Sequence, residues 1–462
     1  MIPRESHDVV VIGGGPAGLS AALAASKAGA RVAIVEREER LGGILKQCVH
    51  DGFGLVRFGE KLSGPEYARR FAREAEASAI ELRLQTFVHE AKRGGESGDK
   101  GFSLDCVSKE RGVFSIDARA LVLATGCRER TDRQVFIHGD RPAGILTAGL
   151  AQRLVNVEGL LPGRRAVILG SGDIGLIMAR RLLLEGMEVE GVYELKSEPS
   201  GLARNLRQCL DDFGIPLHLS MTVIEVRGKR RVESVTVAAV DARGAPIPGT
   251  ERKIDCDTLV LSVGLIPENE LGLSLGLSLD PSTRGPKADQ RGATSVPGLF
   301  ACGNALHVND LVDYVSDSGE AAGRAAAAYA ASRAIGTAVG PETENAVGAI
   351  SLKAGPGFLY AVPQWIEPAG GEAVIYFRSN ATIREGVKVR LRAIGGTIGG
   401  ATINGAALDG AVLVEKRFAA LRPPEMERLI MDPAAIPAGT SELFLELERL
   451  TSPPRKGDSD GR

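Results

Sequence analysis

The chain has 462 residues, of which 44% are hydrophobic and 25% charged, and its formal net charge at pH 7 is −2. This length and composition suit about three ordinary globular domains, and the absence of a basic excess argues against a nucleic-acid partner. Because no apolar stretch is long enough to span a membrane and the polar start Met1–Asp8 is unlike a signal peptide, we expect a cytoplasmic protein.

The first predicted unit opens with an apolar strand, Val9–Ile12, which runs into a glycine-rich turn and a helix over 16–27. The turn consists of Gly13, Gly14, Gly15, Pro16, Ala17 and Gly18. In such a fingerprint one glycine makes the tight turn, one lets a pyrophosphate approach the backbone, and one lets helix and strand pack closely. Glu36 ends the next strand, where a carboxylate would hold a ribose diol.

A helix is expected over 64–78, and strands over 80–90 and 102–116 with a polar hairpin tip at 93–100. A buried strand then runs from Ala120 to Thr125-Gly126. We assign residues 1–150 to the first part of this nucleotide-binding domain.

The second unit, 151–275, repeats this order. The apolar strand Ala166–Leu169 enters a second fingerprint, and Glu194 ends the next strand. The turn consists of Gly170, Ser171, Gly172, Asp173, Ile174 and Gly175. Short strands follow near 217–226 and 232–240, and a buried strand ends at Val263-Gly264. Two fingerprints in phase, each with its acid, indicate two bound dinucleotides in an α/β fold of two Rossmann-like domains.

Residues 276–340 return to the first domain and end in an Ala-rich helix over about 317–335. Alternating residues and glycine turns predict a small β-rich domain over 345–450, and the polar residues 451–462 predict a disordered tail. Because this third domain offers a rigid surface with one polar face, we expect it to bind a second copy or a partner protein.

Six cysteines, at 48, 106, 127, 209, 256 and 302, form neither a CxxC pair nor any metal-ligand spacing. We therefore expect a reducing compartment, no metal, and no dithiol.

With these motifs the chain resembles the two-dinucleotide flavoproteins, the pyridine nucleotide-disulfide oxidoreductase family, over about residues 8–335. The resemblance implies FAD at the N-terminal site and NAD(P)H at the inserted one. It adds Gly43, Thr125, Gly126, Gly303 and Asn304 to the FAD site, and it adds Gly264 to the NAD(P)H site. Asn304 replaces an aspartate that bonds the flavin ribityl chain in this family, and an amide can accept the same bond.

Further segments, among them 42–54, 124–130 and 307–313, resemble a bacterial subgroup that includes the FAD subunits of opine or hydroxyproline dehydrogenases and of hydrogen cyanide synthase. Members often act beside a glycerol-3-phosphate-dehydrogenase-like flavoprotein, so the resemblance implies such a partner and is compatible with a homo-oligomer. We expect an FAD-dependent oxidoreductase that exchanges hydride with NAD(H). The alternatives are an NADH oxidase or peroxidase, and a non-catalytic or electron-transfer subunit of an amino-acid or hydroxy-acid dehydrogenase complex.

Three residues are candidates for catalysis. Cys48 is either a redox thiol that cycles through sulfenic acid or a small apolar neighbour of the flavin. His50 and His307 lie in segments that the resemblance brings near the flavin, as proton carriers or as structural residues. Glu194 should bind a ribose diol and repel a 2′-phosphate, which favours NADH, although Lys196 and Arg204 leave room for NADPH.

Overall fold

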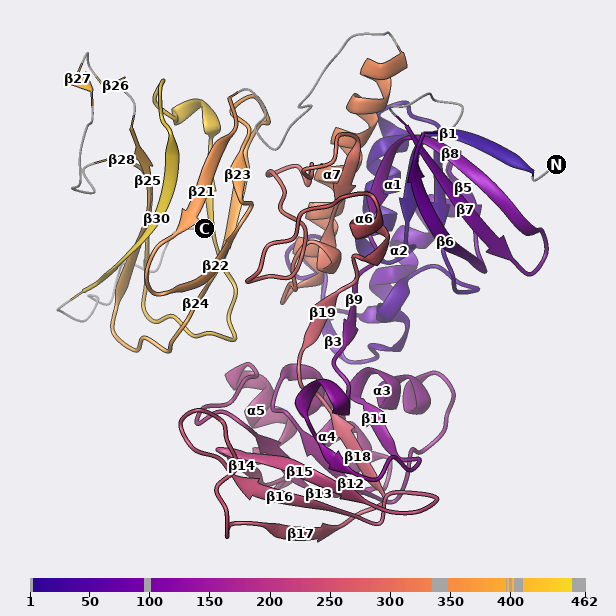
Figure 1. The fold of residues 1–462 in the computed structure, drawn as a ribbon, viewed down its shortest axis with the longest axis vertical. Coiled ribbons are helices and arrows are strands. Elements are labelled where there is room, and N and C mark those ends of the chain that lie inside the picture. The colour runs from indigo at the N-terminus through magenta and orange to yellow at the C-terminus, as the bar shows by residue number, and fades with distance from the viewer. Residues whose placement is uncertain are drawn as a thin grey trace. The chain divides into compact units, whose positions relative to one another are not determined.

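The computed structural model describes residues 3–94, 101–334, 348–395, 397–398, 401–402 and 410–450. The chain divides into two compact units (Figure 1). The first comprises Met1–Leu45, His50–Gly126 and Pro267–Arg462, and the second comprises Lys46–Val49 and Cys127–Ile266. The expected hairpin tip, in large part, and the expected disordered tail lie outside the described residues.

The first unit is built on a seven-stranded sheet in which β1 lies between β2 and β8, with all three parallel. Strands β8, β7 and β6 continue the sheet as an antiparallel meander, and β20 pairs with the end of β8 in parallel. Its strands are β1 (Arg4–Ile12), β2 (Val32–Val35), β5 (Glu81–Arg83), β6 (Thr86–Arg93), β7 (Phe102–Ser108), β8 (Gly112–Leu123) and β20 (Leu299–Ala301). A small pair, β3 (Asp51–Phe53) and β4 (Leu62–Ser63), precedes α2.

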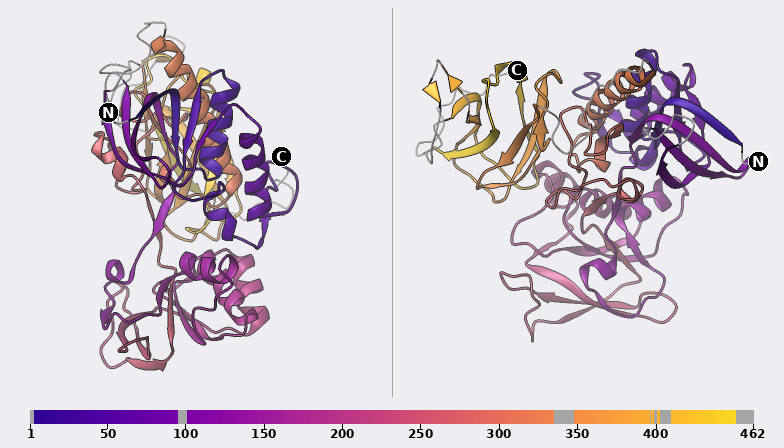
Figure 2. Two further views of the ribbon diagram at one scale, coloured as in Figure 1. Left: turned by 90° about the vertical axis from the view of Figure 1, so that its right-hand side faces the viewer. Right: turned by 45° about the horizontal axis from the view of Figure 1, so that its top comes forward.

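Alternation along β1 assigns its side chains to two hydrophobic cores. Val9 and Val11 pack with three helices, whereas Val10 and Ile12 pack with the meander strands. The helices are α1 (Pro16–Lys27), α2 (Gly64–Glu76) and α7 (Val312–Ala334), and a short α6 (Glu270–Ser274) lies on the other side. Figure 2 shows the indigo helices and the orange α7 on the same side of the sheet.

Helices α1 and α7 pack with their backbones in close contact. A Cβ atom added to Gly319 would lie 2.2 Å from the carbonyl oxygen of Ala17, and one added to Gly323 would lie 2.0 Å from that of Ala21. Only glycine fits where two helix backbones approach this closely. The two glycines therefore fix how α7 lies along the fingerprint helix.

The second unit has three layers. A parallel five-stranded sheet has helices on one face and a mainly antiparallel four-stranded sheet on the other. The parallel strands are β11 (Ile145–Thr147), β12 (Arg165–Leu169), β13 (Glu188–Glu194), β14 (Leu217–Leu219) and β18 (Thr258–Leu261). The second sheet holds β10 (His138–Gly139), β15 (Met221–Arg227), β16 (Ser234–Ala239) and β17 (Arg252–Asp255). The helices are α3 (Ala148–Asn156), α4 (Asp173–Leu184) and α5 (Ala203–Cys209), and β9 (Cys127–Glu129) pairs with β19 (Leu265–Pro267).

The C-terminal β-rich domain of the first unit has two principal sheets around one apolar core. The five-stranded sheet contains β21 (Ile350–Ala354), β23 (Trp365–Ile366), β25 (Val387–Ile394), β28 (Ala411–Phe418) and β30 (Glu442–Arg449). The three-stranded sheet contains β22 (Phe358–Val362), β24 (Ala373–Ser379) and β29 (Glu427–Met431). A separate pair is β26 (Thr397–Ile398) and β27 (Ala401–Thr402).

The expected fold class, two Rossmann-like domains and a β-rich C-terminal domain, is confirmed. The second unit comprises Lys46–Val49 and Cys127–Ile266 in the structure, whereas the sequence predicts residues 151–275. Helix α7 begins at Val312, five residues before the expected start. Among the described residues, no helix is both long and apolar enough to cross a membrane.

Candidate dinucleotide-binding sites

The first fingerprint forms the turn between β1 and α1, and its glycines meet different surroundings. Gly13 has φ +107°, and a Cβ there would lie 2.4 Å from the carbonyl oxygen of Ala124. A Cβ on Gly18 would lie 1.8 Å from the oxygen of Gly13. A Cβ on Gly15, in contrast, would have only the Cα of Gly43 within 4 Å, at 3.8 Å. Gly13 and Gly18 are thus required by packing, whereas Gly15 faces open space, as a site for pyrophosphate needs.

The N-terminus of α1 has no side-chain cap, because Gly15 is the N-cap residue. Helices α2 and α3 instead have Ser63 and Thr147 as caps, each accepting a hydrogen bond from a backbone N–H of the first turn. Uncapped N–H groups at a helix start carry a partial positive charge and bind phosphate well. The first fingerprint therefore has the donors that a dinucleotide pyrophosphate requires.

Glu36 is 6% exposed and lies against this turn. Its Oε2 accepts a hydrogen bond from the N–H of Gly14 at 2.7 Å, and its Oε1 accepts one from the N–H of Glu38 at 2.8 Å. Each oxygen keeps a further lone pair. The carboxylate can therefore fix the turn and still accept two bonds from a ribose diol.

Other predicted residues of this site come from distant parts of the first unit. Gly43 (φ +53°) lies across from Gly15, and Thr125 donates its hydroxyl to the carbonyl oxygen of Glu268 at 2.6 Å. Gly126 has φ +73°. Gly303 packs so closely that a Cβ would lie 2.7 Å from the Cβ of Ala17. The structure thus brings Gly43 and Gly303 to the start of α1.

Asn304 is half-buried and follows Gly303. Its Oδ1 accepts a hydrogen bond from the N–H of Asn309 at 3.0 Å. The side chain of Asn309 in turn donates to the carbonyl oxygen of His307 at 2.8 Å. Asn304 therefore belongs to a loop held by its own internal hydrogen bonds.

The second fingerprint repeats the first. Gly170 has φ +98°, and a Cβ there would lie 2.0 Å from the oxygen of Ser262, while one on Gly175 would lie 2.6 Å from the oxygen of Gly170. The nearest atom to a Cβ on Gly172 is 3.5 Å away, so this glycine faces space. Gly172 is also the N-cap of α4, which has no side-chain cap. Gly264 (φ +106°) ends the neighbouring segment, and Ile174 packs at the edge of the helical core.

Glu194 is 5% exposed and holds the second turn as Glu36 holds the first. Its Oε2 accepts bonds from the N–H and the hydroxyl of Ser171 at 2.9 and 2.6 Å, and its Oε1 accepts one from the N–H of Lys196 at 3.0 Å. The hydroxyl of Ser171 also accepts a bond from the N–H of Ser200 at 2.8 Å. Both units thus place a buried carboxylate against the backbone N–H that follows the first glycine.

Asp173 is not aimed at an anion site. Its Oδ1 accepts hydrogen bonds from the N–H of Leu202 at 2.9 Å and from the side-chain amide of Asn205 at 2.7 Å. These bonds hold the segment at the start of α5 in place. Asp173 therefore connects the fingerprint helix to the segment that follows Glu194.

The three candidate catalytic residues have separate surroundings. The thiol of Cys48 lies 3.7 Å from Oε1 of Gln152 on α3, and burial raises its pKa to about 12. His50 is half-buried against Phe53, with ring centroids 4.9 Å apart. His307 is 2% exposed, and burial together with the charge of Arg378 lowers its pKa to about 4. Its ring centroid lies 5.3 Å from that of Tyr376.

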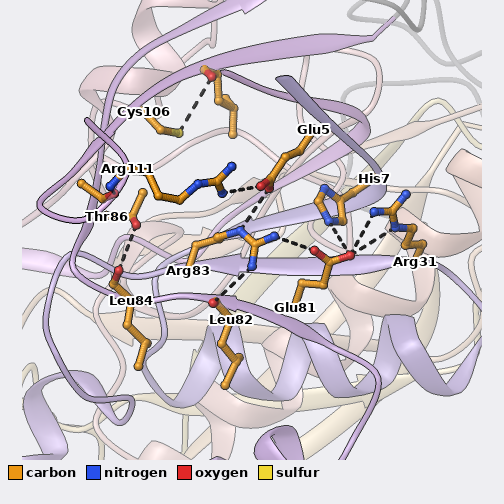
Figure 3. A network of polar contacts seen from close by, with 12 residues as sticks. Glu5, His7, Arg31, Glu81, Leu82, Arg83, Leu84, Thr86, Cys106 and Arg111 are labelled. Atoms are coloured by element: carbon orange, nitrogen blue, oxygen red, sulfur yellow. Dashed lines mark hydrogen bonds and ion pairs between the residues drawn. The ribbon is translucent and has the colours of Figure 1, made fainter. Parts of the chain in front are cut away.

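One group of described side chains has the donor atoms for a metal ion, namely Glu5, His7 and Glu81 (Figure 3). Glu5 is paired with Arg83 and Arg111, and Glu81 is paired with Arg31 and Arg83. Although burial raises the pKa of each carboxyl, Arg83 and Arg111 hold the pKa of Glu5 below its ordinary value, and Arg31 and His7 do the same for Glu81. Guanidinium groups at this density oppose a cation, so we interpret the group as an ion-pair network that joins β1 and β5 to Arg31 and to Arg111, which precedes β8.

The sequence did not predict the roles of several residues that shape the sites. Gly319 and Gly323 set the packing of α7 on α1, and Ser171 holds Glu194. The spacing of Gly319 and Gly323 on one helix face could have indicated a close helix contact. Nothing in the local sequence marks Arg378, which contacts the Asn304 loop from the C-terminal domain.

Comparison with known proteins places these features in a family. Residues 7–334 match the family model described as pyridine nucleotide-disulphide oxidoreductase. The HcnB subunit of hydrogen cyanide synthase of Pseudomonas aeruginosa is 29% identical over 290 residues, which cover 58% of this chain and 59% of HcnB. The A subunit of opine oxidase of Rhizobium meliloti is 27% identical over 325 residues, 65% of this chain and 59% of that protein. The match thus spans about three fifths of each relative.

Two solved structures are similar in fold. Thioredoxin reductase of Lactococcus lactis aligns with a TM-score of 0.57 and 19% identity over 70% of this chain and 99% of its own. Thioredoxin reductase of T. acidophilum aligns with a TM-score of 0.55 and 23% identity over 71% and 99%. The chain belongs to the pyridine nucleotide-disulphide oxidoreductase family, whose members are FAD- and NAD(P)-dependent oxidoreductases.

Proposed function

We propose that this chain binds FAD at the first fingerprint and NAD(H) at the second, and exchanges hydride between them. The observation that carries the proposal is the pair of matching turns. Each has an uncapped helix N-terminus, a glycine that faces open space, and a buried carboxylate bonded to the turn. Bound FAD supplies the redox chemistry, while the chain supplies position, phosphate donors and ribose acceptors.

Two matched substitutions test this assignment. Gly15 and Gly172 have ordinary φ values of −78° and −63°, so valine is allowed by the backbone at either position. Its side chain would then fill the space that the pyrophosphate needs. We expect Gly15→Val to give colourless protein, and Gly172→Val to keep its flavin but lose rapid reduction by NADH. The readouts are flavin absorbance per chain and anaerobic stopped flow.

Each variant serves as the control for the other, because both make the same change at the start of a helix. A Gly15→Val protein with one FAD per chain would show that the first site is wrongly assigned. A Gly172→Val protein that NADH reduces as fast as the wild type would show that the second site is wrongly assigned.

We propose further that electrons leave or enter the flavin through a second substrate or a partner flavoprotein subunit of the glycerol-3-phosphate dehydrogenase type. The structure describes all six cysteines, and none is in a disulfide. Burial raises the pKa of Cys48, Cys106, Cys256 and Cys302 to about 12, which leaves these thiols protonated at neutral pH. Two relatives are named as subunits, which supports a multi-subunit enzyme.

Reductive titration separates this path from a disulfide reductase. We expect dithionite to deliver two electrons per FAD. The NADH-reduced protein should be reoxidised by a co-purified partner flavoprotein and not by glutathione disulfide or lipoamide. Uptake of four electrons, or rapid reoxidation by either disulfide, would contradict the proposal.

A further inference from the structure

The C-terminal domain contacts the nucleotide-binding part of its own unit through the outer face of the three-stranded sheet. Ile375 and Phe377 of β24 point into the domain core, so the alternate residues Tyr376 and Arg378 point outward. They meet the segment His307–Tyr314, which joins the Asn304 loop to α7. We call this contact the joint.

Arg378 is the centre of the joint, with a side chain only 12% exposed. Its guanidinium pairs with the carboxylate of Asp310 and donates to the hydroxyl of Tyr360 at 2.8 Å and to the carbonyl oxygen of Val308 at 3.5 Å. The other carboxylate oxygen of Asp310 accepts a bond from the N–H of Met426 at 2.7 Å. Both oxygens of Asp310 are thus held by the C-terminal domain.

Apolar and aromatic contacts surround this ion pair. The ring of His307 lies 5.3 Å from that of Tyr376, and the guanidinium of Arg428 lies 4.5 Å from the ring of Tyr314. A second line of bonds joins Gln364 to both backbone groups of Ala288, at 3.0 Å each. The domain is therefore docked on its own chain over a broad contact.

One short loop connects the joint to the proposed flavin site. Asp310 is bonded covalently to Asn309, and both the N–H and the side chain of Asn309 bond to Oδ1 of Asn304, at 3.0 and 3.4 Å. The other end of the loop is Gly303, whose Cα packs against Ala17 at the start of α1. A change in the position of Asp310 therefore reaches Asn304 through a single residue.

We infer that Arg378 is a positioning residue for FAD: by holding Asp310, the C-terminal domain keeps the Gly303–Asp310 loop in its flavin-binding form. This inference rests on the proposed FAD site and deepens it. Coupling between two binding events is reciprocal. If docking of the C-terminal domain favours FAD binding, bound FAD should therefore stabilise that docking equally. The outer face of the three-stranded sheet is thus covered by a segment of the same chain.

The test compares Arg378→Gln with Arg390→Gln in the full-length holoprotein. Arg390 lies on the five-stranded sheet and pairs with Glu415 and Glu448, so its loss also removes ion pairs from the C-terminal domain. We expect Arg378→Gln to weaken FAD binding at least tenfold and to speed amide hydrogen exchange across Gly303–Asp310. Arg390→Gln should change neither.

FAD affinity within twofold of the wild type in Arg378→Gln, with unchanged loop exchange, would overturn the inference. Should Arg378→Gln fail to fold, Tyr360→Phe removes one bond to the guanidinium and should weaken FAD binding in the same direction; an unchanged affinity there overturns the inference too. A wild-type chain that binds no FAD would contradict the proposed function instead. Loop exchange in the apoprotein would still test whether Arg378 orders the loop.

Discussion

At the residue scale, the two acids at the strand ends have a double role. Sequence spacing assigns Glu36 and Glu194 to a ribose, but it gives no sign that each also holds its own glycine turn. Glu194 is the more constrained, because it accepts three hydrogen bonds from the chain where Glu36 accepts two. The difference comes from Ser171, since Gly14 at the corresponding position has no hydroxyl. A serine would also not fit at position 14 without a shift of Leu41, because a Cβ there would lie 2.7 Å from a methyl of Leu41.

The charge of Glu194 gives a test of cofactor choice. We expect the wild-type flavin to be reduced faster by NADH than by NADPH, because a carboxylate repels a 2′-phosphate. Glu194→Gln keeps the size of the side chain but removes that charge, so it should narrow the preference roughly tenfold, about 1.4 kcal/mol. Anaerobic stopped flow with each nucleotide measures the ratio.

Glu188→Gln is the matched control, since Glu188 is an exposed residue at the other end of the same strand, β13. It should leave the ratio unchanged. If NADPH were the faster reductant of the wild-type protein, the proposed preference for NADH would be wrong.

The surroundings of Cys48 bear on the peroxidase alternative. Formation of sulfenic acid requires a thiolate, and a thiol with a pKa of about 12 is almost entirely protonated at neutral pH. One contact of the thiol is with the side-chain amide of Gln152, which is uncharged. The raised pKa thus favours the interpretation of Cys48 as a half-buried neutral residue.

At the scale of elements, the sequence predicts the bounds of a helix best where glycine or proline residues mark its ends. Helix α1 has the expected bounds, because Gly15-Pro16 starts it and Gly29 follows it. Helix α7 begins earlier than expected, since its first residues carry no local start signal. The carboxylate of Asp313 in that first turn accepts a bond from the N–H of Arg57, a contact between segments far apart in sequence.

The strands of the C-terminal domain show the same limit. Alternation along β25 correctly predicts a buried face, and its outward Arg390 and Arg392 pair with glutamates of neighbouring strands. The same pattern along β24 makes Tyr376 and Arg378 look solvent-facing. They are covered by the His307 segment instead, and no periodicity within one strand can report which distant segment covers its outer face.

At the scale of the whole molecule, buried histidines couple stability to pH. Burial lowers the pKa of His7, His218 and His307, the last to about 4. The unfolded chain, with histidine pKa values near the ordinary 6.5, therefore binds more protons than the folded chain between about pH 6.5 and pH 4. The contribution of these neutral histidines to the free energy of unfolding is fully present above this pH range, and it is lost as the pH falls through the range.

Protonation of His307 should make the stability of the C-terminal domain depend on pH. Because the pKa of His307 falls from 6.5 to about 4, its neutral form contributes roughly 3 kcal/mol to the free energy of unfolding, of which about 2 kcal/mol should be lost between pH 7.5 and pH 5. Trp365, the single tryptophan of the chain, lies on β23 and reports unfolding of the C-terminal domain by its fluorescence. We expect the urea midpoint to fall over this pH range in the wild type and to fall much less in His307→Phe, which cannot take up the proton. His89→Gln, an exposed histidine on β6, is the control and should behave as the wild type does. An equal pH dependence in His307→Phe and the wild type would show that protonation at the joint does not destabilise the docking of the C-terminal domain.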